Sequence, residues 1–556
     1  MSASLPNSFV ASRFVFLGAV LCTFIFFAPY HHRLNNPNEG VRIFMVKAMV
    51  DHDQYHIDPV VKQWKYINDK SKRDGKLYSS KAPLMSMMGA IVYEVYRWFG
   101  APLDEQSLTL LCRRWANALP CFLLLLLLAW LLDKTTHDRR LTDFIILCLA
   151  TGTHLLAYVH VFSGHTLAAL GTGVMMLLLL NASNSNSIWR DSVLVGACGT
   201  ASVAAEYPAF LAVLPLAVGF LFHHRKQLLK SLCGCVVGAL PFALLAGWAH
   251  HQMFGAFWKT GYSFLENKNF NRMHSQDFFG IGIPQPDILM KALFSTDVGL
   301  FFFCPLALLG VMALGRWFFQ KGKRVNALFI SAAMLGMLFF ISGHRGWRGG
   351  WVIGPRYISE MTCMLVLLAG LFLHEQNAFR KGESKLLTFA LLCSVIGVLH
   401  SGIGGAFFPH FSETYNNPVY EMMIPMALTG FSPDSWALGW GLPPKAAAWT
   451  GLGILFAPLL IWLAQNQFFW GKRPLLVVMI GLWGAMLVGP MLPDTKAQNF
   501  SLETRKMYRI WEPPTGRPLN FSASQTDLAA QMSLGESKKY IKQLNQVCRS
   551  KQGGAQ

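Results

Sequence analysis

Charged residues are scarce in this sequence. Asp, Glu, Lys and Arg together make up 14% of the 556 residues, whereas hydrophobic residues make up 53% and aromatic residues 13%. A water-soluble chain of this length would fold into several domains with charged surfaces. Long apolar runs instead recur between residues 15 and 490, which fits a chain whose main solvent is lipid. The composition therefore excludes an ordinary soluble multidomain protein.

Acidic residues are the scarcest charged type. The sequence has 29 Asp and Glu against 48 Lys and Arg, a formal net charge of +19. An excess of this sign often indicates nucleic-acid binding, but no nucleic-acid motif accompanies it. The basic residues fall mostly in short loops between apolar runs, which fits contact with anionic lipid or the positive-inside rule. We expect no nucleic-acid partner.

A disulfide framework is also lacking. The eleven cysteines are scattered, and nearly all lie within apolar runs as small hydrophobic residues. Cys233 and Cys235 are too close together to indicate a metal site without further ligands, and Cys548 stands alone near the C-terminus. The cysteine pattern indicates neither a disulfide-rich fold nor a zinc module.

The long apolar runs predict an all-α polytopic membrane protein with about thirteen spanning helices. The first apolar run has no convincing cleavage site after it, so we expect a retained helix rather than a signal peptide. Residues 83–100 are apolar but interrupted by Glu94 and Arg97, which favours a helix lying in the membrane interface. The predicted spans are residues 14–30, 108–132, 142–161, 166–180, 192–205, 208–222, 229–247, 298–314, 325–341, 357–373, 386–404, 446–463 and 474–492.

Loop charges predict which side each loop faces. With a cytoplasmic N-terminus and an interfacial 83–100 helix, the basic turns fall inside, whereas a span at 83–100 would put them all outside. Residues 1–492 are then the transmembrane domain, and residues 31–107 are a first outer loop with interfacial helices. Residues 493–556 form a small outside C-terminal region, with a helix expected near residues 525–544.

The first outer loop holds a candidate catalytic carboxylate, Glu39. Pro37 and Asn38 indicate a helix start, with Asn38 as the N-cap, so Glu39 falls in the first turn. A carboxylate there can act as a general base on an acceptor hydroxyl or amine, or orient it. It can equally stabilise the helix through its dipole or pair with Arg42.

Lys81 is the second candidate in this loop. It stands in SSKAP, just before the predicted interfacial helix, where a compact ammonium suits a lipid phosphate. The alternative is a lysine that snorkels to the headgroups. The run Asp51-His52-Asp53, followed by His56 and Asp58, contains ligands for a divalent metal, but so short a pattern is common, and it favours a solvated loop. No cofactor is indicated.

The segment GHRGWRGGWVIGPRYISE, residues 343–360, is the second informative stretch. Arg345 and Arg348 lie at a membrane edge, where arginines bind phosphate in a bidentate manner. Arg356 opens a span, where a charge is costly unless it faces a cavity or a partner. Aromatic residues such as Tyr357 can stack on a sugar or form an interfacial belt. We predict all four as substrate-binding residues.

Further polar residues stand at predicted outer helix ends. His165 lies in FSGHT and Glu206 in AAEYP, and Asp297 precedes another span. Each alone is typical of a local hydrogen-bond partner, but together they indicate that the outer face is the functional one. His165 and Arg42 complete the predicted substrate-binding set.

Four stretches, in their order along the chain, carry a family resemblance. They are PNEGVRIFMVKAMVDHDQYHID, GKLYSSKAP, AEYPAFLAVLP and GGWVIGPRYISEM. With them the chain resembles the GT-C superfamily of polyprenyl-phosphate-dependent membrane glycosyltransferases, near the protein O-mannosyltransferases and the aminoarabinose transferases of lipid A. The resemblance covers about residues 14–373, and the order of the stretches is more specific than any one of them.

The resemblance implies transfer of a sugar from a polyprenyl-phosphate donor to a glycan, lipid or protein acceptor on the extracytoplasmic face, in a bacterial inner membrane. It implies that Glu39 is the catalytic carboxylate, that Lys81 contacts the lipid phosphate, and that Arg356 serves the phosphate or the sugar. Many relatives have Asp-Glu where this chain has Asn38-Glu39, and their catalytic acid is often the Asp. The alternative functions are a transporter or flippase of an envelope component, and a non-catalytic subunit of envelope assembly.

Overall fold

The computed structural model describes residues 7–27, 29–30, 36–64, 67–277, 280–379, 385–407, 409–411, 415–424, 435–470 and 473–488. Regular structure in this part of the chain is helical except for one two-stranded hairpin, which confirms the predicted helical fold class. The predicted C-terminal region, residues 493–556, lies outside the described residues, as does the helix expected near residues 525–544.

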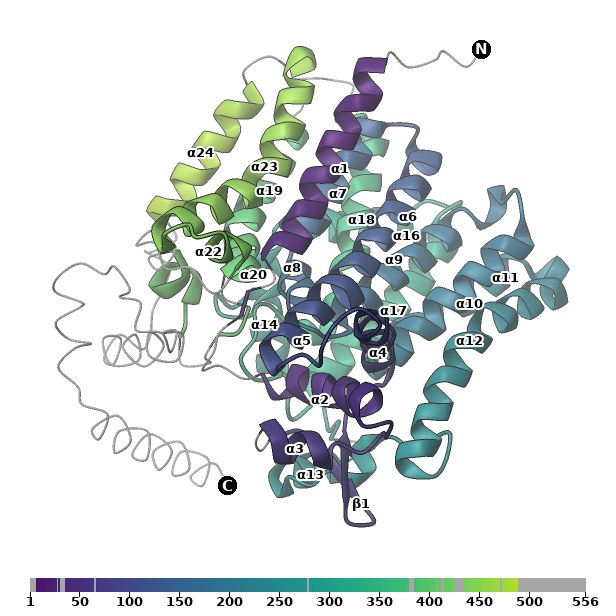
Figure 1. Cartoon of the computed structure of the whole chain (residues 1–556). Helices are drawn as coiled ribbons and strands as arrows, with labels where there is room; N and C mark the ends of the chain where they lie inside the picture. The colour runs from purple at the N-terminus through teal and green to yellow at the C-terminus, as the bar shows by residue number, and fades with distance from the viewer. Residues whose placement is uncertain are drawn as a thin grey trace.

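The first third of the chain contributes one long helix, the first loop and a group of helices that follows it (Figure 1). Its elements are α1 (Asn7–Phe27), α2 (Pro37–Asp51), α3 (Asp58–Trp64), β1 (Lys70–Arg73), β2 (Lys76–Ser79), α4 (Leu84–Arg97), α5 (Glu105–Leu111), the π-helical turn η1 (Cys112–Ala118), α6 (Leu119–Thr136), α7 (Arg139–Thr151), α8 (Leu155–Val159) and α9 (His165–Leu180).

The rest of the chain adds the helices on either side of this centre. They are η2 (Ala182–Asn184), α10 (Ile188–Ala205), η3 (Tyr207–Ala209), α11 (Phe210–His223), η4 (Arg225–Gln227), α12 (Leu228–Phe254), η5 (Gly261–Phe264), α13 (Lys268–Ser275), α14 (Pro286–Phe294), α15 (Leu300–Phe303), α16 (Ala307–Phe318), α17 (Arg324–Gly343), η6 (Arg356–Ile358), α18 (Ser359–Glu375), α19 (Lys385–Gly397), η7 (Val398–Gly402), α20 (Ile403–Phe407), η8 (Val419–Met423), α22 (Trp436–Gly439), α23 (Pro444–Trp470) and α24 (Arg473–Val488).

Several helices are long and apolar enough to cross a membrane, as expected of an integral membrane protein. Within the described residues six helical stretches meet this criterion, and the number of about thirteen spans remains a prediction. The six are Glu105–Thr136, Arg225–Phe254, Arg324–Gly343, Arg356–Glu375, Lys385–Phe407 and Ala446–Asn466. Shorter apolar helices are Arg13–Phe26, His165–Leu180, Tyr207–His223, Ala307–Phe318 and Leu475–Ala485.

Two predicted spans are not continuous helices. The run 142–161 is divided between α7, which ends at Thr151, and α8. The residue after α7 is its C-cap Gly152, whose carbonyl lies against Gly397. The run 298–314 is divided between α15 and α16. Pro305 stands at this second break, and proline lacks the N–H that a continuous helix requires. Both predictions of single helices were wrong at these positions.

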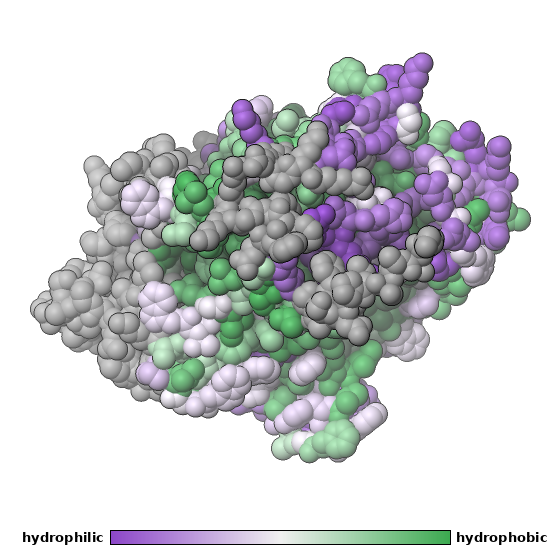
Figure 2. Space-filling view, turned by 90° about the horizontal axis from the view of Figure 1, so that it is seen from above, coloured by the Kyte–Doolittle hydropathy of each residue, from purple (hydrophilic) through white to green (hydrophobic). Residues whose placement is uncertain are grey.

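The molecule has two distinct ends. At one end lie α2, α3, the β1–β2 hairpin and α13, and we call this the loop end (Figure 1). The opposite end is fixed by ion pairs between Arg13, Asp133 and Asp143 and between Lys323 and Glu375. Figure 2 looks onto that opposite end and shows hydrophilic side chains gathered over part of it.

The centre of the bundle is formed by α9 and α18. Nearly every residue of both helices is buried, and 89% of the apolar window in Arg356–Glu375 lies inside the protein. By contrast only 17% of the corresponding window in Arg225–Phe254 is buried, so α12 stands at the edge. The buried pair reaches the loop end with His165 on α9 and Arg356 just before α18, which places polar side chains beneath the first loop.

Candidate functional site

The helix that carries the predicted carboxylate begins slightly earlier than expected. Asn36, not Asn38, is the N-cap of α2, and its side chain accepts a hydrogen bond from the Asn38 N–H. Pro37 occupies the first helical position, which its fixed φ favours. Glu39 lies in the first turn, and every residue of α2 from Asn38 to Ala48 is buried.

Glu39 is bound by Arg113 of η1. The guanidinium donates from Nε to Oε1 at 2.6 Å and from Nη2 to Oε2 at 2.5 Å, and the Phe162 N–H donates to Oε1 at 2.7 Å. Only 5% of the Glu39 side chain is exposed. Both carboxylate oxygens are therefore engaged, and Arg113 is the partner rather than Arg42.

Arg42 reaches a different carboxylate, Glu206, at the junction of α10 and η3. Arg42 Nη2 donates to Glu206 Oε1 at 2.6 Å, and Arg42 Nη1 donates to the Asn38 carbonyl at 2.9 Å. The Gly164 N–H also donates to Oε1, at 3.2 Å, and His165 Nε2 lies 3.8 Å from it. All of these contacts fall on Oε1, while 12% of the Glu206 side chain stays exposed.

Lys81 follows the β1–β2 hairpin and is buried beside it. Its ammonium pairs with Asp69 at 2.8 Å and lies 5.7 Å from the centre of the Tyr262 ring. Burial lowers the pKa of Lys81, but the Asp69 carboxylate and the nearby tyrosines outweigh burial, so the pKa is raised above its ordinary value. The hairpin holds Tyr262 nearby because Ser71 Oγ donates to the Gly261 carbonyl at 2.7 Å.

Arg356 lies in the same region, in η6 just before α18. Its Nη2 donates to the Tyr357 hydroxyl at 3.2 Å, and its guanidinium lies 5.0 Å from the centre of the Tyr357 ring. The Nε atom is buried and has no hydrogen-bond partner. Gly349 allows this placement, because a Cβ there would lie 2.4 Å from Arg356 Nε, and its φ is +77°.

These side chains act on one another. Arg42, Lys81, His165 and Arg356 all exert an electrostatic effect on Glu206. Burial raises the pKa of the Glu206 carboxyl, but these neighbours outweigh burial, so the pKa is lowered. We call this set the Glu206 cluster. Two predicted substrate-binding residues, Arg42 and His165, thus lie within 4 Å of one carboxylate, and Lys81 and Arg356 act on it electrostatically. All four lie far from Glu206 in the sequence, which marked Glu206 only as a local hydrogen-bond partner.

Aromatic rings surround part of this cluster. Neighbouring ring centres along the row lie 4.9–6.1 Å apart, from Tyr262 to His274, His344, Tyr357 and His165. We call Tyr262, His274, His344 and Tyr357 the ring wall. Burial, with His274 and Arg356, lowers the pKa of His344 to about 4, and its Nδ1 accepts from the Gly346 N–H at 2.9 Å.

The other predicted binding residues lie in ion pairs of the nearby loops. Arg345 pairs with Asp277 at 2.9 Å, with 49% of its side chain exposed, and Arg348 pairs with Asp297. Neither is among the residues with the largest electrostatic effect on Glu206. They tie the 343–357 segment to the loop that carries α13 and α14.

The acidic run of the first loop holds helices together. Asp51 accepts from Lys47 at 2.6 Å, from the Tyr93 hydroxyl at 2.8 Å and from Arg97 at 3.0 Å, which fixes α4 on α2. His56 contacts Asp58 at 3.0 Å. In the part of the chain that the structure describes, no group of three His, Cys, Asp or Glu side chains is arranged to hold a metal ion.

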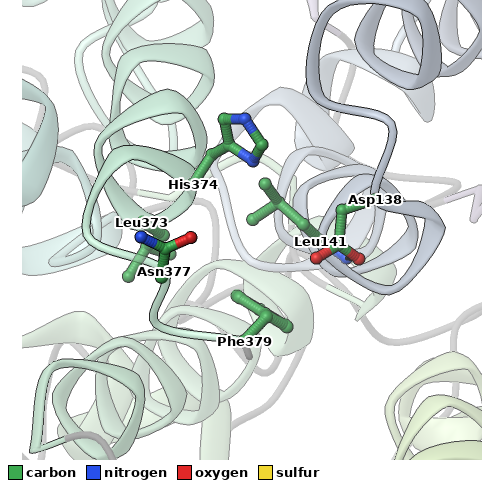
Figure 3. Close-up of a pocket in the computed structure, with 6 residues that line it drawn as sticks. All are labelled: Asp138, Leu141, Leu373, His374, Asn377 and Phe379. Atoms are coloured by element: carbon green, nitrogen blue, oxygen red, sulfur yellow. Dashed lines mark hydrogen bonds between the residues drawn. The ribbon is translucent and has the colours of Figure 1, made fainter. Parts of the chain in front are cut away.

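A small surface hollow, drawn close up in Figure 3, lies where α7 begins and α18 ends, at the end of the molecule opposite the loop end. It is lined by Asp138, Leu141, Leu373, His374, Asn377 and Phe379. Asp138 is the N-cap of α7, where it accepts from the Arg140 N–H at 3.1 Å. The hollow contains none of the predicted site residues.

Comparison with known proteins finds likeness in structure only. No protein-family model matches the chain, and no curated protein matches it. Solved structures are similar over most of its length. ArnT from Cupriavidus metallidurans in the apo state is 15% identical, with 87% of this chain and 78% of that chain covered and a TM-score of 0.47. The same protein bound to undecaprenyl phosphate gives 16% identity, 87% and 77% coverage, and a TM-score of 0.43.

A third similar structure is the archaeal oligosaccharyltransferase AglB from Archaeoglobus fulgidus, in complex with an inhibitory peptide and a dolichol-phosphate. It is 11% identical with a TM-score of 0.39, and the match covers 76% of this chain and 58% of AglB. None of these likenesses reaches a TM-score of 0.5, so none carries an argument about the superfamily of this chain. At such identities and TM-scores they carry no residue correspondence, so the function proposed below rests on the contacts of this chain.

Proposed function

We propose that this protein is a membrane glycosyltransferase that moves a hexosyl or pentosyl group from a polyprenyl-phosphate donor to an acceptor at the loop end, on the extracytoplasmic face of the membrane. The observation that carries the proposal is the Glu206 cluster, in which Arg42 pairs with the carboxylate at 2.6 Å and Lys81 and Arg356 act on it electrostatically. Arg42 and Lys81 each pair with an acid, whereas Arg356 has no acidic partner among the described residues. A buried cation without an acidic partner favours an anionic ligand.

Lys81 and Arg356 are the proposed ligands of the donor phosphate. Lys81 has three N–H donors and one acidic partner, while Arg356 has a buried Nε without a partner. In the transfer, the bond between the anomeric carbon and the phosphate oxygen breaks, and a bond to the acceptor atom forms. The two cations stabilise the negative charge that develops on the leaving phosphate.

Two carboxylates are candidates for the group that takes the acceptor proton. Glu39 is the one predicted from the sequence, but its oxygens already accept from Arg113 and Phe162, so it must exchange a partner to bind an acceptor. Glu206 has all its hydrogen bonds on Oε1, which leaves Oε2 for an acceptor hydroxyl or amine. We propose Glu206 as this base and Glu39 as the residue that positions α2 against η1.

The ring wall is the proposed surface for the sugar. Tyr262 lies beside Lys81, and Tyr357 lies beside Arg356, so a sugar attached to the phosphate would meet these rings. Aromatic faces bind the apolar face of a sugar ring, while hydroxyl and imidazole groups offer hydrogen bonds.

The test is transfer of labelled sugar from polyprenyl-phosphate donors to candidate acceptors by the purified full-length protein. We expect Lys81→Ala to lower turnover by roughly a hundredfold, since it removes a cation from the leaving phosphate. Lys259→Ala is the matched control, because Lys259 is exposed near the end of α12 and the change removes the same charge.

Glu206→Gln and Glu39→Gln separate the two carboxylates when donor binding is measured beside turnover. We expect Glu206→Gln to abolish transfer while the donor still binds. Loss of transfer in Glu39→Gln alone would return the role of base to Glu39. Movement of the intact donor across the membrane, with no transfer to any acceptor, would favour the transporter instead.

A further inference from the structure

Arg114, next to the arginine that binds Glu39, has no acidic partner among the described residues. Its Nε atom is buried without a hydrogen bond, and the charged neighbour that acts on it is Arg113, which carries the same sign. The contact that the structure gives its guanidinium is the face of Trp436, 4.3 Å from the ring centre. The guanidinium of Arg114 therefore keeps N–H groups that can donate to a ligand.

The surroundings of Arg114 mark the edge of the apolar layer. Trp436 packs on Phe26, near the C-terminal end of α1, with ring centres 6.4 Å apart. Trp115 and Trp440 beside it are 44% and 69% exposed. Exposed tryptophans at the end of a spanning helix are typical of the headgroup region of a bilayer.

A guanidinium whose Nε is buried without a hydrogen bond is costly unless an acceptor meets it. The described residues near Arg114 supply a ring and a like charge, which leaves room for an anion from outside the chain. The anions available at the headgroup level of a membrane are lipid phosphates, which a guanidinium binds with two parallel hydrogen bonds. Stacking on Trp436 holds the guanidinium plane in position for such a pair.

We propose that Arg114 and Trp436 form a binding site for the phosphate of an anionic membrane phospholipid, separate from the Glu206 cluster. Arg114 donates to the lipid phosphate, and Trp436 with Trp440 borders the glycerol and upper acyl region. The site is independent of sugar transfer, because neither residue belongs to the Glu206 cluster.

The experiment uses the purified full-length protein in neutral detergent with a photoactivatable phosphatidylglycerol, and measures the yield of cross-linked protein. We expect Arg114→Gln to need roughly tenfold more lipid for half-maximal capture, since a charge-assisted hydrogen bond is lost. Lys259→Gln, which removes one exposed cation near the end of α12, is expected to match wild type.

Competition identifies the source of the phosphate. Unlabelled phosphatidylglycerol is expected to displace the probe, whereas glycerol 3-phosphate at the same concentration is not. Displacement by glycerol 3-phosphate, or stronger displacement by polyprenyl phosphate than by phosphatidylglycerol, would overturn the assignment to a phospholipid. Unchanged capture by Arg114→Gln would overturn the site itself.

A folding defect is separated from loss of the site with Arg114→Lys. This variant keeps the charge but loses the planar fork that stacks on Trp436, so we expect weaker capture with an unfolding midpoint close to wild type. Capture equal to wild type in this variant would show that stacking on Trp436 has no part in binding.

Discussion

At the scale of single residues, the buried ion pair between Arg42 and Glu206 is the most consequential contact. Arg42 is fully buried, and the pair joins α2 to the end of α10 at 2.6 Å. Removal of one partner from a buried pair leaves the other charge without compensation. The pair therefore couples the stability of the first loop to the charge balance of the site.

The first prediction concerns this pair. Arg42→Gln is expected to lower the free energy of unfolding by roughly 3–5 kcal/mol, because Glu206 loses its nearest cation. Adding Glu206→Gln to Arg42→Gln is expected to restore part of that loss. Thermal unfolding in detergent measures both, and Arg345→Gln is the control, since its exposed pair with Asp277 is worth no more than about 1 kcal/mol.

The second prediction concerns acid sensitivity at His344. Its pKa is lowered from 6.5 to about 4, so the unfolded chain binds a proton between these values while the folded protein does not. Stability is therefore full above about pH 6.5 and falls by roughly 3 kcal/mol as the pH drops toward 4. The groups that face His344 are His274, Phe340, Tyr357 and Arg356.

His344→Phe keeps a ring of similar size and removes the titrating group. We expect its unfolding midpoint to change less between pH 7 and pH 4.5 than that of wild type. His52→Gln, a change at an exposed histidine of the first loop, is expected to leave the wild-type pH dependence intact. An unaltered pH dependence in His344→Phe would mean that other groups cause the acid sensitivity.

At the scale of elements, the site depends on turns that bring loops together. The β1–β2 hairpin contacts the 261–267 segment through Lys70–Glu266 at 2.7 Å and Asn267–Asn68 at 2.9 Å. On the other side, the Gly282 N–H donates to the Gly343 carbonyl at 2.9 Å. Lys81, Tyr262 and Arg356 are thus positioned by side-chain and backbone contacts between separate loops.

The third prediction isolates one of these turns. Gly349 and Gly350 both have positive φ, +77° and +85°, so alanine strains the backbone at either position. A Cβ at Gly349 also meets Arg356, whereas one at Gly350 meets nothing within 4 Å. We expect Gly349→Ala to lower transfer well below the level of Gly350→Ala at similar stability. Equal transfer in the two variants would show that the position of Arg356 does not depend on this contact.

At the scale of the whole molecule, α12 is held at the edge mainly by glycine contacts with α10. A Cβ at Gly196 of α10 would lie 1.9 Å from the Cys235 carbonyl oxygen, and one at Gly238 of α12 would lie 2.0 Å from that of Val193. Small residues let helices approach closely in lipid, where no hydrophobic force drives them together.

The fourth prediction follows from this packing. Gly196→Ala is expected to lower the free energy of unfolding by roughly 1–3 kcal/mol, because the two backbones must separate. Gly18→Ala is the control, since no atom lies within 4 Å of a Cβ at that helical position. There the better helix propensity of alanine is expected to leave stability unchanged or raise it by up to about 1 kcal/mol. Thermal unfolding in detergent compares the two.

Part of the fold and of the site could be predicted from the sequence. Apolar runs indicated the helical fold, and isolated polar residues at helix ends indicated Arg42, Lys81 and Arg356. The proline at position 305 could have predicted the break between α15 and α16. The glycine at position 152 could likewise have predicted the break between α7 and α8. The helix start was misplaced by two residues because Asn36 and Asn38 are equally good N-caps and only Pro37 distinguishes them.

The pairings could not be predicted. Arg113 lies 74 positions from Glu39, and Glu206 lies 164 from Arg42, so no helical spacing relates them. Asp69 and Tyr262 are ordinary loop residues in the sequence, and they meet Lys81 only through the hairpin and η5. A charge pattern shows which residues need partners, but tertiary packing decides which partners they find.

The distance in sequence between Arg42, Glu206 and Arg356 has a consequence for biosynthesis. The ribosome makes Arg42 first, and its carboxylate partner follows 164 residues later, with Arg356 later still. Until then the first loop carries an uncompensated guanidinium beside newly inserted helices. A nascent chain that ends before Glu206 is therefore expected to leave α2 undocked, which makes it a substrate for membrane quality control rather than a folded intermediate.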